Sequence, residues 1–272
     1  MAELGIVFLM FHELVLPGRP LCHAEPGYNR YAVSASDFRN QMETLAHAGW
    51  KGKSVSQAMH SFAERSLGEK SVCITFDDGC ETDLIAAAPI LKNFGFGATF
   101  YITAGFVGKP GYLSEERVRS LRSEGFEIGC HSLSHPYLTD IDGDRLHDEV
   151  AGAKERVQRM AEASVEHFSC PGGRWNESVA SAVKSAGYQT MATSRIGVNF
   201  SHTDRFALAR VAVLKGTRAE KLLRTCSGQG LLRKQLQEKA SEVAKTVLGN
   251  SLYDSLRGLV LGREPDSEAN SR

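Results

Sequence analysis

The chain has 272 residues, which is long enough to bury one large α/β core or two small ones. Its 32 basic and 32 acidic residues cancel, so no excess of positive charge points to nucleic acid as a partner. The six cysteines include no C-x-x-C pair, which excludes the common structural zinc patterns and argues against a disulfide framework.

The first ten residues lack a basic region followed by a small-residue cleavage site, and their apolar run is too short to span a membrane. We therefore expect residues 5–10 to form the first strand. With no export signal in view, the expected location is the cytoplasm, with the inner membrane surface as an alternative.

Strands and helices alternate along the chain after this first strand. Helical spacing of apolar residues, cap residues and short β-branched runs identify the segments. In order they are strand 5–10, helix 36–48 opened by Ser36, a helix from a Ser54–Gln57 capping box to about residue 64, strand 72–76, helix 81–93, strand 98–102, a helix from 114, strand 126–130, helix 143–162, strand 167–170, helix 176–186, strand 189–193 and strand 208–213.

This alternation over about 220 residues predicts parallel strands joined by right-handed crossovers. About seven repeats favour a barrel over an open sheet, although the pattern separates the two poorly. The loop 14–30 is rich in proline and glycine and is long enough to be functional.

The pattern changes after Ser227. Apolar residues at helical spacing predict a helical extension over 228–263, followed by a polar tail at 264–272 that we expect to be disordered. We expect the extension to pack on the domain formed by residues 1–227. Its interspersed basic residues leave open a second interpretation, peripheral binding to a membrane or a partner.

Polar clusters fall at the carboxyl ends of four predicted strands, the edge at which barrels and open α/β sheets bind ligands. They are His12, Asp77-Asp78, His131 with His135, and Pro171-Gly172-Gly173.

The pair Asp77-Asp78 ends the buried strand 72–76. Two adjacent carboxylates there must be hydrated, hydrogen-bonded or bound to a cation, and their repulsion raises one pKa unless a metal absorbs the charge. The simpler interpretation is an ordinary Asp-Gly turn. We favour a metal on one carboxylate and proton transfer at the other. Cys80, which directly follows this turn, is a thiol that could approach the site.

His131 and His135 are four residues apart, so one turn or a tight loop can aim both imidazoles at one point. Two neutral histidines and a carboxylate make a typical facial metal site with open positions. Their position after a strand, alongside the Asp pair, favours metal binding over packing or surface roles.

The segments TFDDG at 75–79 and HSLSHP at 131–136 resemble the first two motifs of the polysaccharide deacetylases, the NodB-homology group of carbohydrate esterase family 4. The similarity in order and spacing covers residues 5 to about 215. It implies a distorted (β/α)7 barrel that holds one divalent metal, usually zinc, with Co²⁺, Mn²⁺ or Ni²⁺ as alternatives.

Carried onto this sequence, the resemblance makes Asp78, His131 and His135 the metal ligands and Asp77 the catalytic base. The segment Phe168–Gly173 resembles the third motif, in which the N–H of Gly172 would help to hold the oxyanion.

Two features depart from the family pattern. Ser169 stands where the family has an arginine that orients the catalytic aspartate, and Arg210 is the candidate replacement, with Arg174 as the second choice. The late histidine acid is not recognisable after residue 200. Phe11-His12-Glu13 instead resembles the Tyr-His segment of the poly-N-acetylglucosamine deacetylase branch, which makes His12 the candidate acid. Otherwise His12 simply lines the pocket.

The predicted function is that of a metal-dependent hydrolase that removes an N-acetyl group from an amino sugar in a saccharide or glycolipid. The same groups would also serve a deformylase or an O-acetyl esterase. A non-catalytic carbohydrate-binding protein on a decayed barrel is the alternative of another class, and the retained aspartates and histidines argue against it. The sugar and the oligomeric state are left open.

Overall fold

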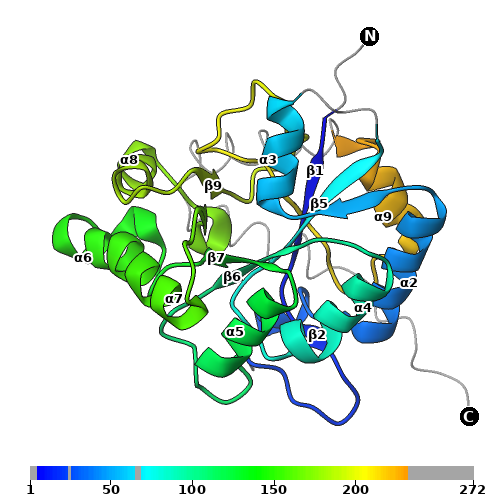
Figure 1. The fold of residues 1–272 in the computed structure, drawn as a ribbon, viewed down its shortest axis with the longest axis horizontal. Helices are drawn as coiled ribbons and strands as arrows, with labels where there is room; N and C mark the ends of the chain where they lie inside the picture. The colour runs from blue at the N-terminus through cyan, green and yellow to red at the C-terminus, as the bar shows by residue number, and fades with distance from the viewer. Residues whose placement is uncertain (1–4, 24–25, 65–68, 232–272) are drawn as a thin grey trace, which may run out of the picture. The chain divides into compact units, whose positions relative to one another are not determined.

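The computed structural model describes residues 5–23, 26–64 and 69–231. Within them, parallel strands form one curled sheet, with helices packed around it (Figure 1). The strands of this sheet are β1 (Val7–Phe11), β4 (Lys51–Lys53), β5 (Ser71–Phe76), β6 (Thr99–Ile102), β7 (Glu127–Cys130), β8 (His167–Ser169), β9 (Thr190–Ala192) and β10 (Val211–Ala212). A separate two-stranded ladder joins β2 (Leu14–Val15) and β3 (Val33–Ser34).

The helical segments follow the predicted alternation closely. They are α1 (Pro26–Asn29), α2 (Ala35–His47), α3 (Val55–Ala63), α4 (Ala88–Asn93), α5 (Glu115–Ser123), α6 (Gly143–His147), α7 (Ala153–Ala161), α8 (Glu177–Ser185) and α9 (Ala219–Cys226), with π segments η1 (Asp83–Ala87) and η3 (Asp148–Gly152) and 3₁₀ segments η2 (Leu138–Asp140) and η4 (Pro171–Gly173). The capping box of Ser54 and Gln57 is confirmed, whereas α2 is capped by Ser34 instead of Ser36, because the Ser34 Oγ accepts the Asp37 N–H.

The strand order is β10-β1-β5-β6-β7-β8-β9. One edge of β5 is shared by two strands: β4 pairs with its amino-terminal half, and β6 pairs with its carboxyl end. A parallel bridge between Ala192 and Leu208 connects β9 to the segment that leads into β10. The Thr193 N–H donates to the Leu208 carbonyl at 2.9 Å, and the Leu208 N–H donates to Met191 at 3.0 Å. The segment that contains Leu208 thus links the two ends of the sheet, and the predicted distorted barrel is confirmed.

Several segments differ from the sequence-based expectation. Within the predicted strand 208–213, only β10 forms a ladder with a neighbouring strand. The predicted helices 81–93 and 143–162 each contain a π segment. The elements β2, β3, β4, α1 and α9 were not predicted. Strands of two or three residues and a four-residue helix are too short to carry a periodic signal. The longer α9 begins after Arg218, which is not a capping residue type, so no cap motif marks its start.

The predicted extension begins at residue 228, and the structure describes it only to residue 231. The rest of the extension, the predicted tail at 264–272 and the predicted membrane or partner contact of the extension lie outside the described residues. Among the helices that are described, none combines the length and the hydropathy needed to cross a membrane.

Apolar side chains cover both faces of the sheet. Val7 and Leu9 of β1 point to the cluster under the outer helices, while Phe8 points inward to a second cluster with Cys73, Tyr101 and the α3 residues. Because successive side chains of a strand alternate between faces, the buried strands read as continuous apolar runs. The inner cluster places α3 across the amino end of the barrel.

Three phenylalanines fix the register of the central strands. Phe11 of β1 stacks on Phe76 of β5, with ring centroids 5.2 Å apart, and Phe76 stacks on Phe100 of β6 at 5.0 Å. The same residues are register partners in the ladders. A one-residue slip would move every side chain to the opposite face, so this stack determines which residues meet beyond the strand ends.

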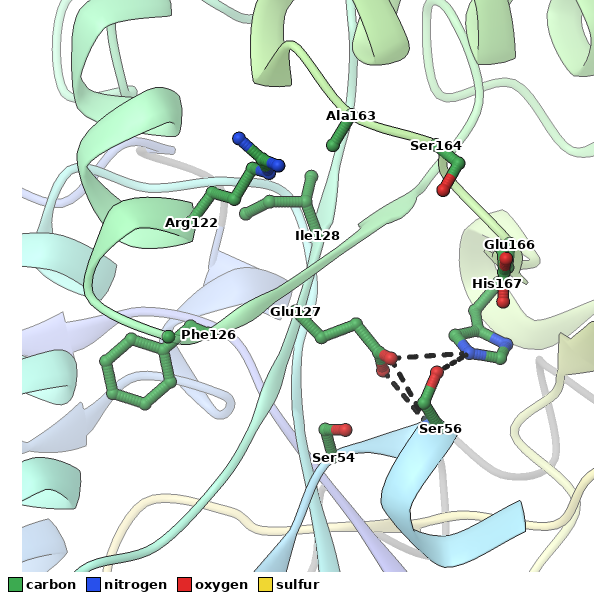
Figure 2. A pocket seen from close by; sticks show the side chains of 11 residues that line it. Ser54, Ser56, Arg122, Phe126, Glu127, Ile128, Ala163, Ser164, Glu166 and His167 are labelled. Carbon is green, nitrogen blue, oxygen red and sulfur yellow. Dashed lines mark hydrogen bonds and ion pairs between the residues drawn. The ribbon is translucent and has the colours of Figure 1, made fainter. Parts of the chain in front are cut away.

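A polar seam joins α3 to the amino ends of β7 and β8, beside an open pocket of about 360 Å³ (Figure 2). The Glu127 carboxylate accepts the Ser56 N–H at 3.2 and 3.3 Å, and it also accepts the Thr99 hydroxyl. The His167 Nε2 lies 2.8 Å from the Ser56 Oγ and 3.5 Å from Glu127. Glu127 therefore caps the α3 N-terminus, and we interpret the seam as structural.

Glu127→Gln should destabilise the fold by about 1–3 kcal/mol at pH 7, because the charged acceptor for the α3 N-terminus is lost. Burial raises the pKa of Glu127, but His167 and the Ser56 and Thr99 bonds outweigh it and lower the pKa to about 2. A depressed pKa stabilises the fold above the unfolded value near 4.5, and this contribution disappears as the pH falls towards 2.

Urea unfolding of both proteins between pH 7 and pH 2.5 measures the difference. Glu166→Gln, which changes another carboxylate lining the same pocket, is the control. A difference between wild type and Glu127→Gln that stayed constant down to pH 2.5 would contradict the assignment.

Candidate active site

The register of the strands gathers the predicted site residues at the carboxyl edge of the barrel. The Asp77 N–H donates to the Phe11 carbonyl at 3.0 Å, so His12 and Asp77 follow strand ends that lie side by side. The His131 N–H donates to the Ile102 carbonyl at 2.8 Å, which continues the ladder between β6 and β7. Asp77 and His131 are therefore held in place by hydrogen bonds that continue the strand ladders.

Asp78, His131 and His135 form a compact group whose potential ligand atoms all lie within 4.8 Å of one another. The Asp78 Oδ1 is 3.6 Å from the His131 Nε2 and 3.5 Å from the His135 Nε2. Asp78 and His131 are buried, and His135 is partly exposed. The buried Asp78 Oδ1 has no hydrogen-bond partner among the described residues, which a bound cation would resolve. The donor set therefore fits a divalent metal.

Hydrogen bonding sets the form of His131. Its Nδ1 lies 2.8 Å from the Ser169 carbonyl, which can only accept, so Nδ1 carries the proton and Nε2 presents a lone pair towards Asp78. Burial lowers the pKa of His131 to about 3, although the nearby Asp77 raises it. The imidazole is thus neutral, as a metal ligand requires.

The backbone of the metal group is strained and firmly supported. Asp78, Ser132 and His135 have φ values of 79°, 66° and 65°, a region that non-glycine residues seldom occupy. The Glu149 carboxylate accepts the N–H groups of Leu133 and Ser134 at 3.0 and 2.8 Å. Glu149, which the sequence analysis missed because nothing in its local pattern marks it, holds the histidine loop in this conformation.

Asp77 receives a two-pronged ion pair from Arg210. The Arg210 Nη1 and Nη2 atoms donate to the two carboxylate oxygens, each at 2.8 Å, and both side chains are almost fully buried. The Arg210 Nε donates to the Thr193 carbonyl at 3.0 Å, and Nη2 also donates to the Ser169 Oγ at 2.8 Å. The Ser169 Oγ lies 3.3 Å from both Asp77 oxygens. Arg210 thus occupies the place behind Asp77 that the sequence analysis proposed for it.

The surroundings shift the pKa values of the two adjacent carboxyl groups in opposite directions. Burial raises the pKa of Asp78 to about 6. For Asp77, burial also raises the pKa, but the Arg210 charge, His131 and the Arg210 hydrogen bonds outweigh it and hold the pKa well below its ordinary value. Pairs of carboxyl groups driven apart in this way commonly have separate roles in catalysis.

His12 lies beside this pair with its ring against Tyr31, at a centroid distance of 4.7 Å. Its Nδ1 is buried and has no hydrogen-bond partner among the described residues. Burial lowers the pKa of His12, while Asp78 and Asp77 raise it. The imidazole therefore keeps a free ring nitrogen within the electrostatic reach of both carboxylates.

Gly172 lies in η4, directly after the carboxyl end of β8, with a φ of 61°. A Cβ at this position would lie 2.5 Å from the exposed Tyr137 ring and displace it, and the left-handed φ also favours glycine here. Arg174, the second choice for supporting Asp77, stacks on Tyr137 instead, with its guanidinium carbon 4.1 Å from the ring centroid.

Comparison with known proteins gives matches in sequence and in fold. The sequence profile of the family described as polysaccharide deacetylase matches residues 64–191. A Bacillus subtilis protein, YxkH, whose name classes it with the polysaccharide deacetylases, is 28% identical over 195 residues, which cover 71% of this chain and 70% of YxkH. Peptidoglycan-N-acetylglucosamine deacetylase of Bacillus cereus is 32% identical over 124 residues, which cover 45% of this chain and 56% of that enzyme.

The fold also has solved counterparts. The Streptococcus pyogenes deacetylase PplD, determined in complex with acetate, superposes with a TM-score of 0.73 over 83% of this chain and 99% of PplD, at 22% sequence identity. At this identity the likeness describes the fold alone.

His131→Ala should lose one equivalent of bound divalent metal, because the remaining Asp78 and His135 cannot hold the ion as a three-ligand site does. Elemental analysis of the purified proteins measures the loss. His147→Ala, on the surface of α6, is the control. Equal metal content in wild type and His131→Ala would contradict the site.

Arg210→Ala should destabilise the fold by about 3–5 kcal/mol, because it leaves the Asp77 carboxylate buried without its cation. Arg210→Lys keeps the charge but not the two parallel bonds, so its loss should be smaller. Urea unfolding at pH 7 measures both. Arg174→Ala, which removes a guanidinium from an exposed ring, should change stability by no more than about 0.5 kcal/mol. Equal stability of wild type and Arg210→Ala would refute the importance of the pair.

Proposed function

Because the chain belongs to the polysaccharide deacetylase family, we propose that it is a metal-dependent hydrolase that removes the N-acetyl group from an N-acetylated amino sugar in a saccharide or glycolipid. The observation that carries the proposal is an ionised Asp77, clamped by Arg210, next to an Asp78, His131 and His135 group with a partnerless oxygen. The sugar class is supported by the name of the Bacillus cereus relative, which acts on N-acetylglucosamine in peptidoglycan.

In this proposal, Asp78, His131 and His135 hold the metal. The set of two imidazoles and one carboxylate suits zinc, and Co²⁺, Mn²⁺ or Ni²⁺ could replace it. When bound, a divalent metal polarises the amide carbonyl and lowers the pKa of a coordinated water from about 16 to roughly 7.

Asp77 is the proposed base. Since its pKa is held low, Asp77 is ionised at every working pH but is a weaker base than an ordinary carboxylate. Proton transfer from the attacking water to Asp77 is therefore uphill on its own, and it becomes favourable only as the bond between oxygen and the amide carbon forms. Arg210 keeps the accepting oxygens fixed during this transfer.

The tetrahedral oxyanion would accept a hydrogen bond from the Gly172 N–H. A donor of this kind typically contributes about 3–4 kcal/mol to the transition state. The ring of Tyr137 lies over Gly172, beside the backbone that carries the donor.

An amine leaves only when it is protonated, so a separate acid is required. His12 is the proposed acid. Because burial lowers its pKa, its imidazolium would release the proton readily, and the neighbouring Asp77 and Asp78 charges favour formation of that imidazolium.

Asp77→Asn should retain its metal and reduce acetate release by about 10²–10⁴-fold, since general-base catalysis typically contributes that factor. The assay uses N-acetylglucosamine oligomers, with N-formyl and O-acetyl analogues in parallel, and enzymatic detection of acetate and formate. Asp144→Asn, an exposed carboxylate in α6, is the control.

Full activity of Asp77→Asn would refute the base assignment. Release from the formyl or O-acetyl analogues alone would replace the N-acetyl substrate with that class. Bound metal without release from any substrate would favour the carbohydrate-binding alternative.

A further inference from the structure

A second group of potential metal ligands lies beyond the carboxyl ends of β1 and β5, separate from the group at Asp78. Glu13, Cys22 and Cys80 present a carboxylate oxygen and two sulfurs that all lie within 4.8 Å of one another. Glu13 and Cys80 are buried, and Cys22 is partly buried. The proposed deacetylation uses none of the three.

Each of these side chains is held in place by its surroundings. The Glu13 carboxylate accepts the Cys22 N–H at 2.9 and 3.2 Å, so the loop after β1 folds back on itself. The Cys22 Sγ donates to the Gly111 carbonyl at 2.9 Å. The Tyr28 hydroxyl lies 3.4 Å from the Cys80 Sγ, where it can donate to a thiolate.

Asp83 provides an independent indication of a cation nearby. Its side chain is fully buried, and both carboxylate oxygens lack a hydrogen-bond partner among the described residues. A buried carboxyl group in this situation requires either a proton or a cation.

We propose that Glu13, Cys22 and Cys80 form a second, thiolate-containing zinc site, with a water as the fourth ligand that links the ion to Asp83. Tetrahedral zinc needs sulfur and oxygen ligands roughly 3.5–3.8 Å apart, so inward shifts of about 1 Å or less close the set. Two thiolates select a soft or borderline ion, whereas the group at Asp78 offers only nitrogen and oxygen.

The ligands come from segments that are distant in the chain, so the ion would fasten the loop after β1 to the turn after β5. That loop begins with His12 and Glu13. The second site would therefore have a structural role and would keep His12 fixed beside Asp77.

Cobalt substitution of the full-length, reduced protein tests the proposal. Co²⁺ bound by thiolates has an intense sulfur-to-metal charge-transfer band, which nitrogen and oxygen ligands do not produce. We expect two Co²⁺ per chain and this band in wild type. His131→Ala should lose one Co²⁺ and keep the band, and Cys22→Ser/Cys80→Ser should lose one Co²⁺ and the band. Cys226→Ser, which removes a buried thiol of α9, should keep both.

The wild-type spectrum decides the question even where a variant fails to fold. A wild-type protein that binds Co²⁺ without a thiolate band would overturn the proposal. A second measurement uses the protein purified without a reducing agent. If Cys22 and Cys80 then react with a thiol reagent only after reduction, the pair forms a disulfide, and the proposal is also overturned. Neither readout depends on deacetylase activity, so a failure of the proposed reaction leaves this test intact.

Discussion

The ion pair between Asp77 and Arg210 joins the middle of the sheet to the segment that closes it. Asp77 follows β5 in the middle of the sheet, whereas Arg210 comes from the segment between Leu208 and β10, where the sheet ends meet. Two charges buried together gain little net free energy, because desolvation offsets their attraction. Removing either one is costly, however, so the pair specifies one closed arrangement and fixes the orientation of a carboxylate at its carboxyl edge.

Around this pair, carboxyl groups are concentrated where water is excluded. Asp77, Asp78, Glu13 and Asp83 are all buried, and the Arg210 guanidinium donates two hydrogen bonds to the carboxylate of Asp77. The remaining carboxyl groups need protons or metal ions, and the donor groups around Asp78 and around Cys80 lie where cations would compensate them. Buried carboxyl groups without a neighbouring cation thus account for both candidate metal sites, the one around Asp78 proposed for catalysis and the one around Cys80 proposed for a structural role.

Prediction from the sequence was most reliable where several residues carry one signal. The TFDDG and HSLSHP segments identified Asp78, His131 and His135 as one group, because both follow predicted strands whose carboxyl ends meet at one edge of a parallel sheet. Short elements such as β4 could not be predicted, because two or three residues show no periodicity. The support that Glu149 gives to the histidine loop could not be predicted either, because a carboxylate distant in the chain leaves no local pattern. The choice between Arg210 and Arg174 could be posed from the sequence but not decided.

The sequence by itself determined the alternation of strands and helices, the parallel pairing of the strands and the residue types that gather beyond the strand ends, because periodicity and motif spacing are local properties. Only the tertiary structure decided which side chains meet. Arg210 reaches Asp77 across 133 positions of the chain, and the Cys22 sulfur lies within 4.8 Å of the Cys80 sulfur because the loop after β1 folds back towards the turn after β5. Such contacts depend on strand register and closure of the sheet, which long-range packing sets and no local pattern encodes.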